Sequence, residues 1–171
     1  MRIENKMYRQ VCKLQAYPAA LRPALQNYVM SRFVPFLKTG GIRFEVLTRE
    51  EVVVSVKNVR KVQNHIHNVH ACVMATLAET ATGFVVAMNT PDDKLMLLKS
   101  MHIDYVKRSQ GDMRAQARLT DEQVRLLQQE ERGNFVVPCT VTDQSGEPPI
   151  EVEMVWAWVP KKPPQAPAQS A

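Results

Sequence analysis

The sequence predicts an α+β domain in which a curved antiparallel sheet wraps one long, apolar helix. Apolar residues recur at helical spacing from about residue 71 to residue 88, and no proline interrupts them. Segments that alternate between apolar and polar residues lie before and after this helix along the chain. A helix this apolar needs to be covered, and strands from both sides can cover it. Because 171 residues is the ordinary size of one domain, we expect residues 1–159 to form a single domain.

Two short extra helices are expected at the N-terminus, at about residues 5–16 and 19–34. Tyr17-Pro18 separates them, because the residue before a proline avoids helical backbone angles. Gly40-Gly41 then ends this helical lead-in. The period of the pattern changes to two directly after these glycines, so the sheet is expected to begin there.

Six strands are expected in the remainder of the chain. Turn residues at Thr48-Arg49-Glu50 and at Ser109-Gln110-Gly111 predict two hairpins, which join the first strand to the second and the third to the fourth. The segment from Ser145 to Pro149 separates the last two strands. The six strands are expected at about residues 42–46, 52–56, 95–107, 112–119, 134–143 and 150–159.

One more helix is expected at residues 121–132, rich in helix-forming residues. Thr120 is a favourable residue for its N-cap, and Gly133 ends it. The tail from Pro160, with the sequence PKKPPQAPAQSA, has the composition of a disordered end.

Charge and cysteine content narrow the class of protein. The formal net charge is +5 and the pI is about 9.2, but the basic residues are scattered along the chain, so coenzyme A fits this charge as well as nucleic acid does. No motif interleaves aromatic and basic residues, which disfavours nucleic-acid binding. The three cysteines are far apart and form neither a disulfide framework nor a CxxC motif, so a reducing, cytoplasmic location is the default expectation.

The sequence predicts no membrane span, because no stretch approaches the roughly 20 apolar residues that a bilayer requires. The first 30 residues carry five basic residues against one acid, Glu4, as an organelle import signal would. Low serine content together with Pro18 and Pro23 disfavours import.

The segment NHIHNVHACVMATLAETATG, residues 64–83, combines the features of a reactive site. A polar loop rich in histidine precedes the N-terminus of the long helix, where unpaired N–H groups and the helix dipole can hold an oxyanion. Glu79 follows two turns later, among small residues opposite the apolar stripe. Partial burial there would raise its pKa towards the range of a general base, although a mid-helix glutamate is more often a solvated surface residue.

The same segment resembles the hot-dog-fold thioesterase superfamily, in which an Asn or Gln, an HGG loop and a helical Asp or Glu recur. The pattern NHxxxVHAxxxxxLAExxxG, with IDYVKRSQGDMRAQARL downstream, is most similar to a bacterial and fungal acyl-CoA thioesterase branch, related to the phenylacetate-pathway and 4-hydroxybenzoyl-CoA thioesterases. The resemblance covers about residues 28–158. It implies a hot-dog domain that assembles as a homodimer or tetramer, acts on acyl-CoA and requires no cofactor, since coenzyme A enters as part of the substrate.

The resemblance implies roles for four residues. Glu79 matches the acid that attacks the thioester or activates water, and Asn64 matches the amide that orients the thioester or the water. His70 matches the histidine of the loop, and Ala71 matches the first glycine, whose N–H forms the oxyanion hole. From the residues alone, Asn64 is equally well explained as a loop amide that caps a backbone group, and His70 is better explained as a cap or a satisfied half-buried histidine.

The sequence also departs from the superfamily pattern. Ala71-Cys72 replaces the glycine pair, so a thioester approaches this backbone less closely. A strand position that carries Ser or Thr in some relatives falls near Leu98, which has no hydroxyl. A non-catalytic module that binds acyl-CoA or an acyl chain is therefore the alternative to a thioester hydrolase.

Other residues are candidates for phosphate binding, metal binding or the acyl pocket. Arg60, Lys61, Lys107 and Arg108 are candidates for contacts with the phosphates of coenzyme A, although a position on a solvated surface explains each of them better. His65, His67 and His70 suggest a metal site, but no second ligand cluster exists and no metal is expected. Trp156 and Trp158 share a face of the last strand, as core or interface anchors or as part of an acyl pocket.

Overall fold

The computed structural model describes residues 4–14 and 16–161. In this part of the chain the strands form two antiparallel sheets, with the orders β1-β2-β4-β6 and β3-β7-β5. The elements in chain order are α1 (Lys6–Leu14), α2 (Arg22–Phe33), α3 (Pro35–Gly40), β1 (Ile42–Leu47), β2 (Glu51–Val56), the 3₁₀ turn η1 (Arg60–Val62), α4 (Ala71–Ala87), β3 (Lys94–Tyr105), β4 (Met113–Arg118), α5 (Asp121–Gln129), β5 (Gly133–Val137), β6 (Cys139–Asp143) and β7 (Ile150–Pro160).

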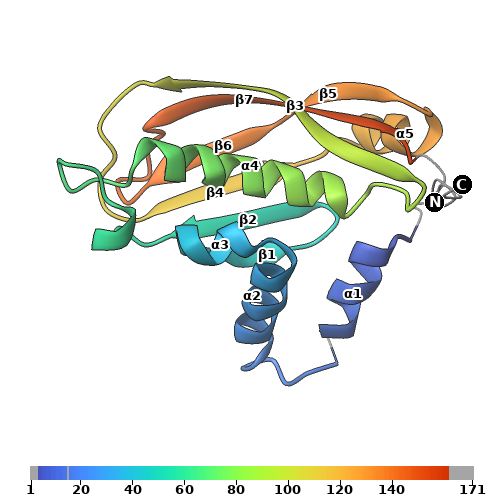
Figure 1. Cartoon of the computed structure of the whole chain (residues 1–171), viewed down its shortest axis with the longest axis horizontal. Coiled ribbons are helices and arrows are strands. Elements are labelled where there is room, and N and C mark those ends of the chain that lie inside the picture. The colour runs from blue at the N-terminus through green and yellow to red at the C-terminus, as the bar shows by residue number, and fades with distance from the viewer. Residues whose placement is uncertain (1–3, 15, 162–171) are drawn as a thin grey trace, which may run out of the picture.

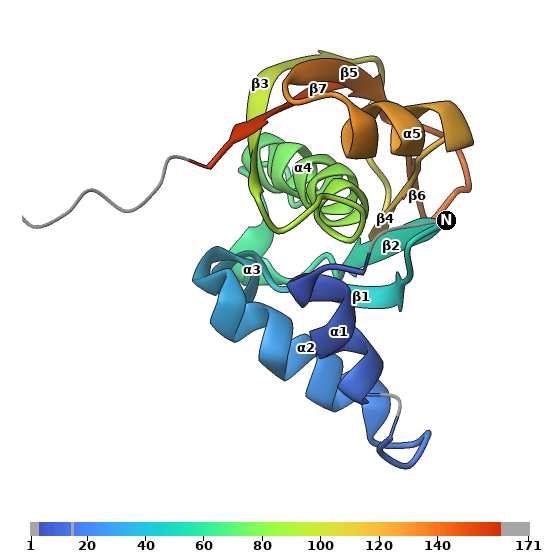
Figure 2. The same cartoon turned by 90° about the vertical axis from the view of Figure 1, so that its right-hand side faces the viewer.

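The two sheets curve around α4, which confirms the expected α+β arrangement and gives the molecule a hot-dog fold. Figure 1 shows α4 running lengthwise between β3, β7 and β5 on one side and β1 and β2 on the other. In Figure 2, β4 and β6 lie between these two groups of strands and close one side of the wrap. The predicted apolar stripe of α4 is fully or almost fully buried: Met74, Leu77, Ala78, Ala81, Val85 and Met88. Sheet residues such as Val52, Val54 and Met154 complete the core.

Three helices, one more than expected, precede the sheet. Pro35 stops α2 because the residue before it, Val34, adopts an extended conformation, and a separate short helix, α3, begins at Pro35. The predicted helix over 19–34 starts too early, because α2 begins at Arg22. The short helix α3 was not predicted. Gly41 ends α3 with φ 68°, a left-handed conformation that favours glycine.

The first hairpin is confirmed, with an irregularity that the alternation did not predict. β1 pairs antiparallel with β2, and the register shifts between Phe44 and Val46. The shift puts Leu47 in the core and leaves Val46 only half-buried, whereas the alternation placed Val46 in the buried set.

The predicted hairpin between residues 95–107 and 112–119 is wrong. β3 pairs along its length with β7, and β4 pairs with β2 and β6, so the two segments belong to different sheets. The N–H groups of Val106 and Lys107 both donate to the carbonyl oxygen of Pro149, which fixes the end of β3 beside the start of β7. Gln110 donates to the Asp143 carboxylate at the end of β6. The turn residues 109–111 therefore cross between the sheets.

The C-terminal half contains two further corrections. Residues 134–143 form two strands, β5 and β6, in different sheets, because Pro138 between them has no N–H to continue a ladder. The helix predicted to residue 132 ends at Gln129, although its cap at Thr120 is confirmed as a capping box with Gln123.

Ordered structure also extends further towards the C-terminus than predicted. Pro160 is the last residue of β7, and Lys161 donates its N–H to Asp93, so the tail does not begin at residue 160. The remainder of the predicted tail, 162–171, lies outside the described residues. Within the described residues, no helix has the length and apolar character to cross a membrane.

Candidate active site

The start of α4 is built by His70. Its backbone is extended, its N–H donates to the carbonyl oxygen of Val62, and its Nδ1 accepts a hydrogen bond from the N–H of Cys72 at 3.1 Å. His70 is therefore the N-cap of α4, the structural alternative that the sequence left open. Its ring still lies at the surface, at the mouth of the helix.

The N–H of Ala71, the first residue of α4, is free among the described residues. The carbonyl oxygen of His70 accepts from the N–H groups of Val73 and Met74, and Cys72 donates to the His70 ring, whereas the N–H of Ala71 donates to no described residue. The carbonyl oxygen of Ala71 accepts from the Tyr105 hydroxyl at 3.2 Å, which ties the end of β3 to the start of α4. A free N–H at the positive end of a helix is the donor that an oxyanion requires.

Asn64 holds the loop that leads into α4. Its Oδ1 accepts from the N–H groups of Ile66 and Asn68, at 3.0 and 3.1 Å, and its own N–H donates to the carbonyl oxygen of Asn68. These bonds form a tight loop in which His67 has a positive φ of 62°. The carbonyl side of the amide is thus engaged, and only its NH₂ group remains for a ligand.

Glu79 lies on the wall of a mostly apolar cavity. This cavity has a volume of about 620 Å³ and is bounded by α1, α2, α4, the start of β3 and Trp156 of β7. Apolar side chains such as Met30, Phe84 and Trp156 form most of its surface. Gly83 leaves room beside the carboxylate, because an added Cβ would lie 2.8 Å from the Trp156 ring and 3.6 Å from the Glu79 Oε1 atom.

Burial raises the pKa of Glu79 above the usual glutamate value, and a hydrogen bond with Thr80 offsets part of this rise. No described ion pair involves Glu79. A carboxylate whose pKa is raised in an apolar cavity is a stronger base than a solvated one, which suits a general base.

Helix geometry separates Glu79 from the free N–H of Ala71. The two residues lie eight positions apart on one straight helix, which corresponds to about 12 Å along its axis at roughly 1.5 Å per residue. One thioester carbonyl must lie about 3 Å from an oxyanion donor and close to the attacking group. The Glu79 and Ala71 of one chain therefore do not meet at one thioester.

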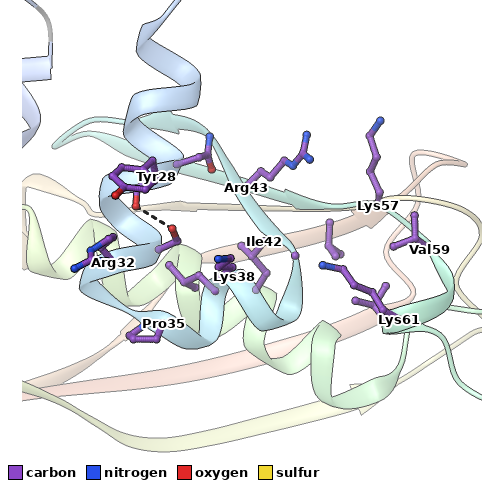
Figure 3. A pocket seen from close by; sticks show the side chains of 15 residues that line it. Tyr28, Arg32, Pro35, Lys38, Ile42, Arg43, Lys57, Val59 and Lys61 are labelled. Carbon is purple, nitrogen blue, oxygen red and sulfur yellow. Dashed lines mark hydrogen bonds between the residues drawn. The ribbon is translucent and has the colours of Figure 1, made fainter.

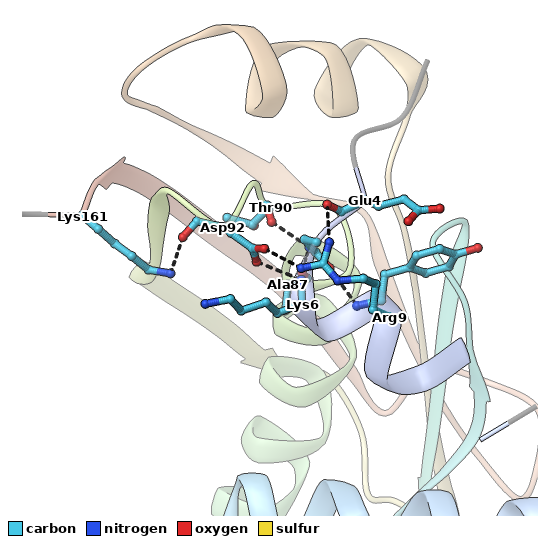
Figure 4. A network of polar contacts seen from close by, with 9 residues as sticks. Glu4, Lys6, Arg9, Ala87, Thr90, Asp92 and Lys161 are labelled. Carbon is cyan, nitrogen blue, oxygen red and sulfur yellow. Dashed lines mark hydrogen bonds and ion pairs between the residues drawn. The ribbon is translucent and has the colours of Figure 1, made fainter. Parts of the chain in front are cut away.

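The N-terminal helices close one end of the cavity, and the sequence did not predict this role for them. Asn5 donates to the carbonyl oxygens of Ala87 and Thr90, at 2.7 and 2.6 Å, and anchors α1 beside the end of α4. Figure 4 shows Asp92 between Lys6 and Arg9 of α1 and Lys161, which follows β7, and the Asp92 carboxylate accepts from the Lys6 N–H and pairs with Arg9. The Lys6 N–H lowers the pKa of Asp92. The one signal in the sequence was Asn5 itself, a favourable N-cap.

The four predicted phosphate-binding cations do not gather in one place. Lys107 pairs with Glu147 at 2.6 Å, and Arg108 and Arg60 are exposed. Lys61 lines a cavity of about 720 Å³, which is not the one that contains Glu79.

The histidines of the loop and the two tryptophans of β7 lie in different environments. His65 and His67 are exposed, and among the described residues no three His, Cys, Asp or Glu side chains gather as metal ligands. Trp156 and Trp158 are both buried, and Trp156 also lines the Glu79 cavity.

Comparison with solved structures identifies the class as the hot-dog fold. A protein of unknown function from Pseudomonas aeruginosa, described as a probable thioesterase, is 24% identical over 81% of this chain and 95% of its own, with a TM-score of 0.73. A thioesterase family protein from Silicibacter pomeroyi is 14% identical over 81% of this chain and 98% of its own, with a TM-score of 0.64. A thioesterase from Haemophilus influenzae is 10% identical over 82% of this chain and 92% of its own, with a TM-score of 0.63.

The chain belongs to the family described as Domain of unknown function (DUF4442), whose model matches residues 22–159. No curated protein matches the chain. The matched region contains α2 to α5 and all described strands but leaves out α1, so the Asn5 anchor at the end of the cavity lies outside it.

Substitution of Asn64 separates its two roles. Asn64→Ala removes the acceptor of two N–H groups and is expected to cost about 1–2 kcal/mol of unfolding free energy. Asn64→Asp keeps the acceptor but replaces the NH₂ group, so its stability is expected to stay close to that of the parent while any function of the NH₂ group is lost. Urea denaturation of both variants measures the first effect. A stable Asn64→Ala variant would contradict the loop assignment.

The raised pKa of Glu79 also predicts a pH-dependent effect on stability. The folded state favours the protonated carboxyl, so ionisation above the unfolded-state pKa costs stability as the pH rises. Glu79→Gln is therefore expected to be more stable than the parent at neutral pH, and this advantage is expected to shrink as the pH falls and to disappear below about pH 4, where both states become protonated. The exposed Glu131→Gln is the control and should show no such trend. A Glu79→Gln variant that is less stable at neutral pH would contradict the burial of an unpaired carboxylate.

Proposed function

We propose that this protein hydrolyses an acyl-CoA thioester to free coenzyme A and a carboxylic acid. The observation that carries the proposal is the unpaired Glu79 carboxyl with its raised pKa, on the wall of an apolar cavity of about 620 Å³. Cavities of this size bury most of a drug-sized ligand, and the apolar wall suits an acyl chain. The structural neighbours that are named thioesterases support the same class of reaction.

In the proposed reaction, Glu79 takes a proton from a water molecule while the water oxygen attacks the thioester carbonyl carbon. The carbonyl oxygen becomes an oxyanion, which the Ala71 N–H stabilises with the dipole of α4. The C–S bond then breaks, the thiolate of coenzyme A leaves, and the proton on Glu79 returns to the sulfur. Direct attack by Glu79 on the carbonyl, followed by hydrolysis of the anhydride, gives the same products.

We further propose that two copies of the chain complete each site, because Glu79 and Ala71 of one copy lie about 12 Å apart along α4. The outer edge of β3 pairs with no described strand and exposes Leu97, Met101 and Tyr105. Antiparallel pairing of β3 with its copy over the full strand, Lys94–Tyr105, places Tyr105 of one copy opposite Lys94 of the other. Tyr105 binds the start of α4, and Lys94 lines the Glu79 cavity. This pairing therefore supports a site made of Glu79 from one copy and Ala71 from the other.

Hydrolysis is tested with a panel of acyl-CoAs of different chain length, with release of free thiol as the measurement. Glu79→Gln is expected to lower kcat by roughly 100-fold or more, while Glu131→Gln keeps the parental rate. The ionised carboxylate is the active form, so kcat/KM is expected to fall at acid pH with a midpoint above the ordinary glutamate pKa. A Glu79→Gln variant that keeps the full rate would contradict the proposal. Tight acyl-CoA binding without any thiol release would favour the non-catalytic binding module instead.

The shared site is tested by complementation. Ala71→Pro removes the free N–H at the first helical position, where proline is tolerated and where the extended His70 suits a following proline. Ala71→Pro and Glu79→Gln are each expected to be inactive. After mixing under conditions that allow exchange, mixed dimers hold one site with both native residues, so about a quarter of the parental activity is expected. No recovery, in a mixture shown by mass to contain mixed dimers, would place both groups in one chain.

A further inference from the structure

A second cavity, which we call the cationic cleft, lies on the other side of α2 from Glu79. It has a volume of about 720 Å³ and lies between α2, α3, η1 and the hairpin of β1 and β2. Five cationic side chains line it, and no Asp or Glu does: Arg32, Lys38, Arg43, Lys57 and Lys61. Figure 3 shows Arg32 at one end with Tyr28, Lys57 and Lys61 at the other with Val59, and Lys38 and Arg43 between them.

Among the residues that the structure describes, none of these five cations joins an ion pair. The acids nearest to them in sequence on β1 and β2, Glu45 and Glu51, pair with Arg114 and Arg118 instead. Lys94 shows how the chain satisfies a structural lysine, because its ammonium donates to three carbonyl oxygens. Five gathered cations without such partners repel one another, so an anion that binds among them removes an electrostatic cost.

The local backbone brings Lys61 into the cleft. Gly41 ends α3 with a positive φ, and the place where a Cβ would stand is only 3.3 Å from the Lys61 Cε and Nζ atoms. A side chain at position 41 would push the end of Lys61 aside by a few tenths of an ångström. Glycine here therefore permits both the left-handed turn and the inward position of Lys61.

The size and the neutral residues of the cleft favour a small nucleotide as the anion. A volume of about 720 Å³ is that of a small-molecule site, whereas a nucleic acid needs an extended basic surface. Tyr28 is 62% exposed and Val59 is 43% exposed on the rim. An exposed aromatic ring gives a purine base a surface on which to stack, which inorganic phosphate would not use.

We propose that the cationic cleft binds a nucleotide that carries two or more phosphate groups. Lys38, Arg43 and Lys61 hold the phosphates, and the base stacks on Tyr28. This site does not depend on the chemistry of Glu79. If the protein hydrolyses acyl-CoA, coenzyme A itself is the expected nucleotide, and the cleft holds its adenosine and phosphates.

Binding is measured by isothermal titration calorimetry with coenzyme A, dephospho-coenzyme A, ATP and pyrophosphate as separate probes. The test variant is Lys38→Gln with Lys61→Gln, and the charge-matched control is Lys13→Gln with Arg132→Gln, two exposed cations away from the cleft and from β3. The test variant is expected to weaken nucleotide binding by about tenfold or more per lysine, and the control not at all. Tyr28→Ala is expected to weaken the nucleotides but not pyrophosphate. Circular dichroism verifies that each variant is folded.

Each outcome decides the proposal. Nucleotide binding that the test variant loses and the control keeps supports it, and tighter binding of coenzyme A than of dephospho-coenzyme A identifies the 3′-phosphate as a recognised group. Absence of nucleotide binding, equal loss in test and control variants, or binding of pyrophosphate alone overturns it. Because the probes carry no acyl group and turnover is not measured, a protein that hydrolyses no thioester can still pass this test.

Discussion

The burial of α4 is the constraint on which the rest of the structure depends. This helix is apolar on nearly all sides, and ten of its 17 residues are buried, so a single sheet face is not enough to cover it. Two sheets curve around it, and the N-terminal helices cover part of the flank that the sheets leave open. The cavity with Glu79 lies where this cover is incomplete. Because Glu79 is partly buried there, its ionisation costs free energy in the folded state, and this cost raises its pKa.

The elements that could be predicted are those whose signals are local. The period of α4, the first hairpin and the Thr120 cap depend on neighbouring residues, and the structure confirms each of them. Strand pairing across the sheets depends on contacts between distant residues. Ser109-Gln110-Gly111 has the composition of a hairpin turn, but hydrogen bonds to Pro149 and Asp143 decide that the chain crosses from one sheet to the other there. No periodicity within the segment contains that information.

In the candidate site, too, the features with a local signal were predictable and those that depend on distant contacts were not. The spacing from His70 to Glu79 was sufficient to place a helix start and an acid on one helix, and the resemblance gave both residues roles, but the cap role of His70 stayed one alternative until the structure showed it. The rise of the helix then puts the acid about 12 Å from the free N–H of Ala71, a consequence that already follows from eight residues of helix but that the motif alone does not express. The wall of the cavity from α1 was not predictable, because Asn5 reaches Ala87 and Thr90 only after folding brings the two ends of this region together.

One helix, α2, separates the two cavities. Val29, Met30 and Phe33 on one side of it face the Glu79 cavity, while Tyr28 and Arg32 on the other side face the cationic cleft. Residues adjacent in sequence point to different sides of a helix, so a segment without a clear apolar stripe can still serve two surfaces. The same folding step gathers the cations at residues 32, 38, 43, 57 and 61, which are spread along the sequence, around one volume. A net charge that looked diffuse in the sequence becomes a local positive field, and such a field attracts a phosphate-bearing ligand to this face of the molecule before any specific contact forms.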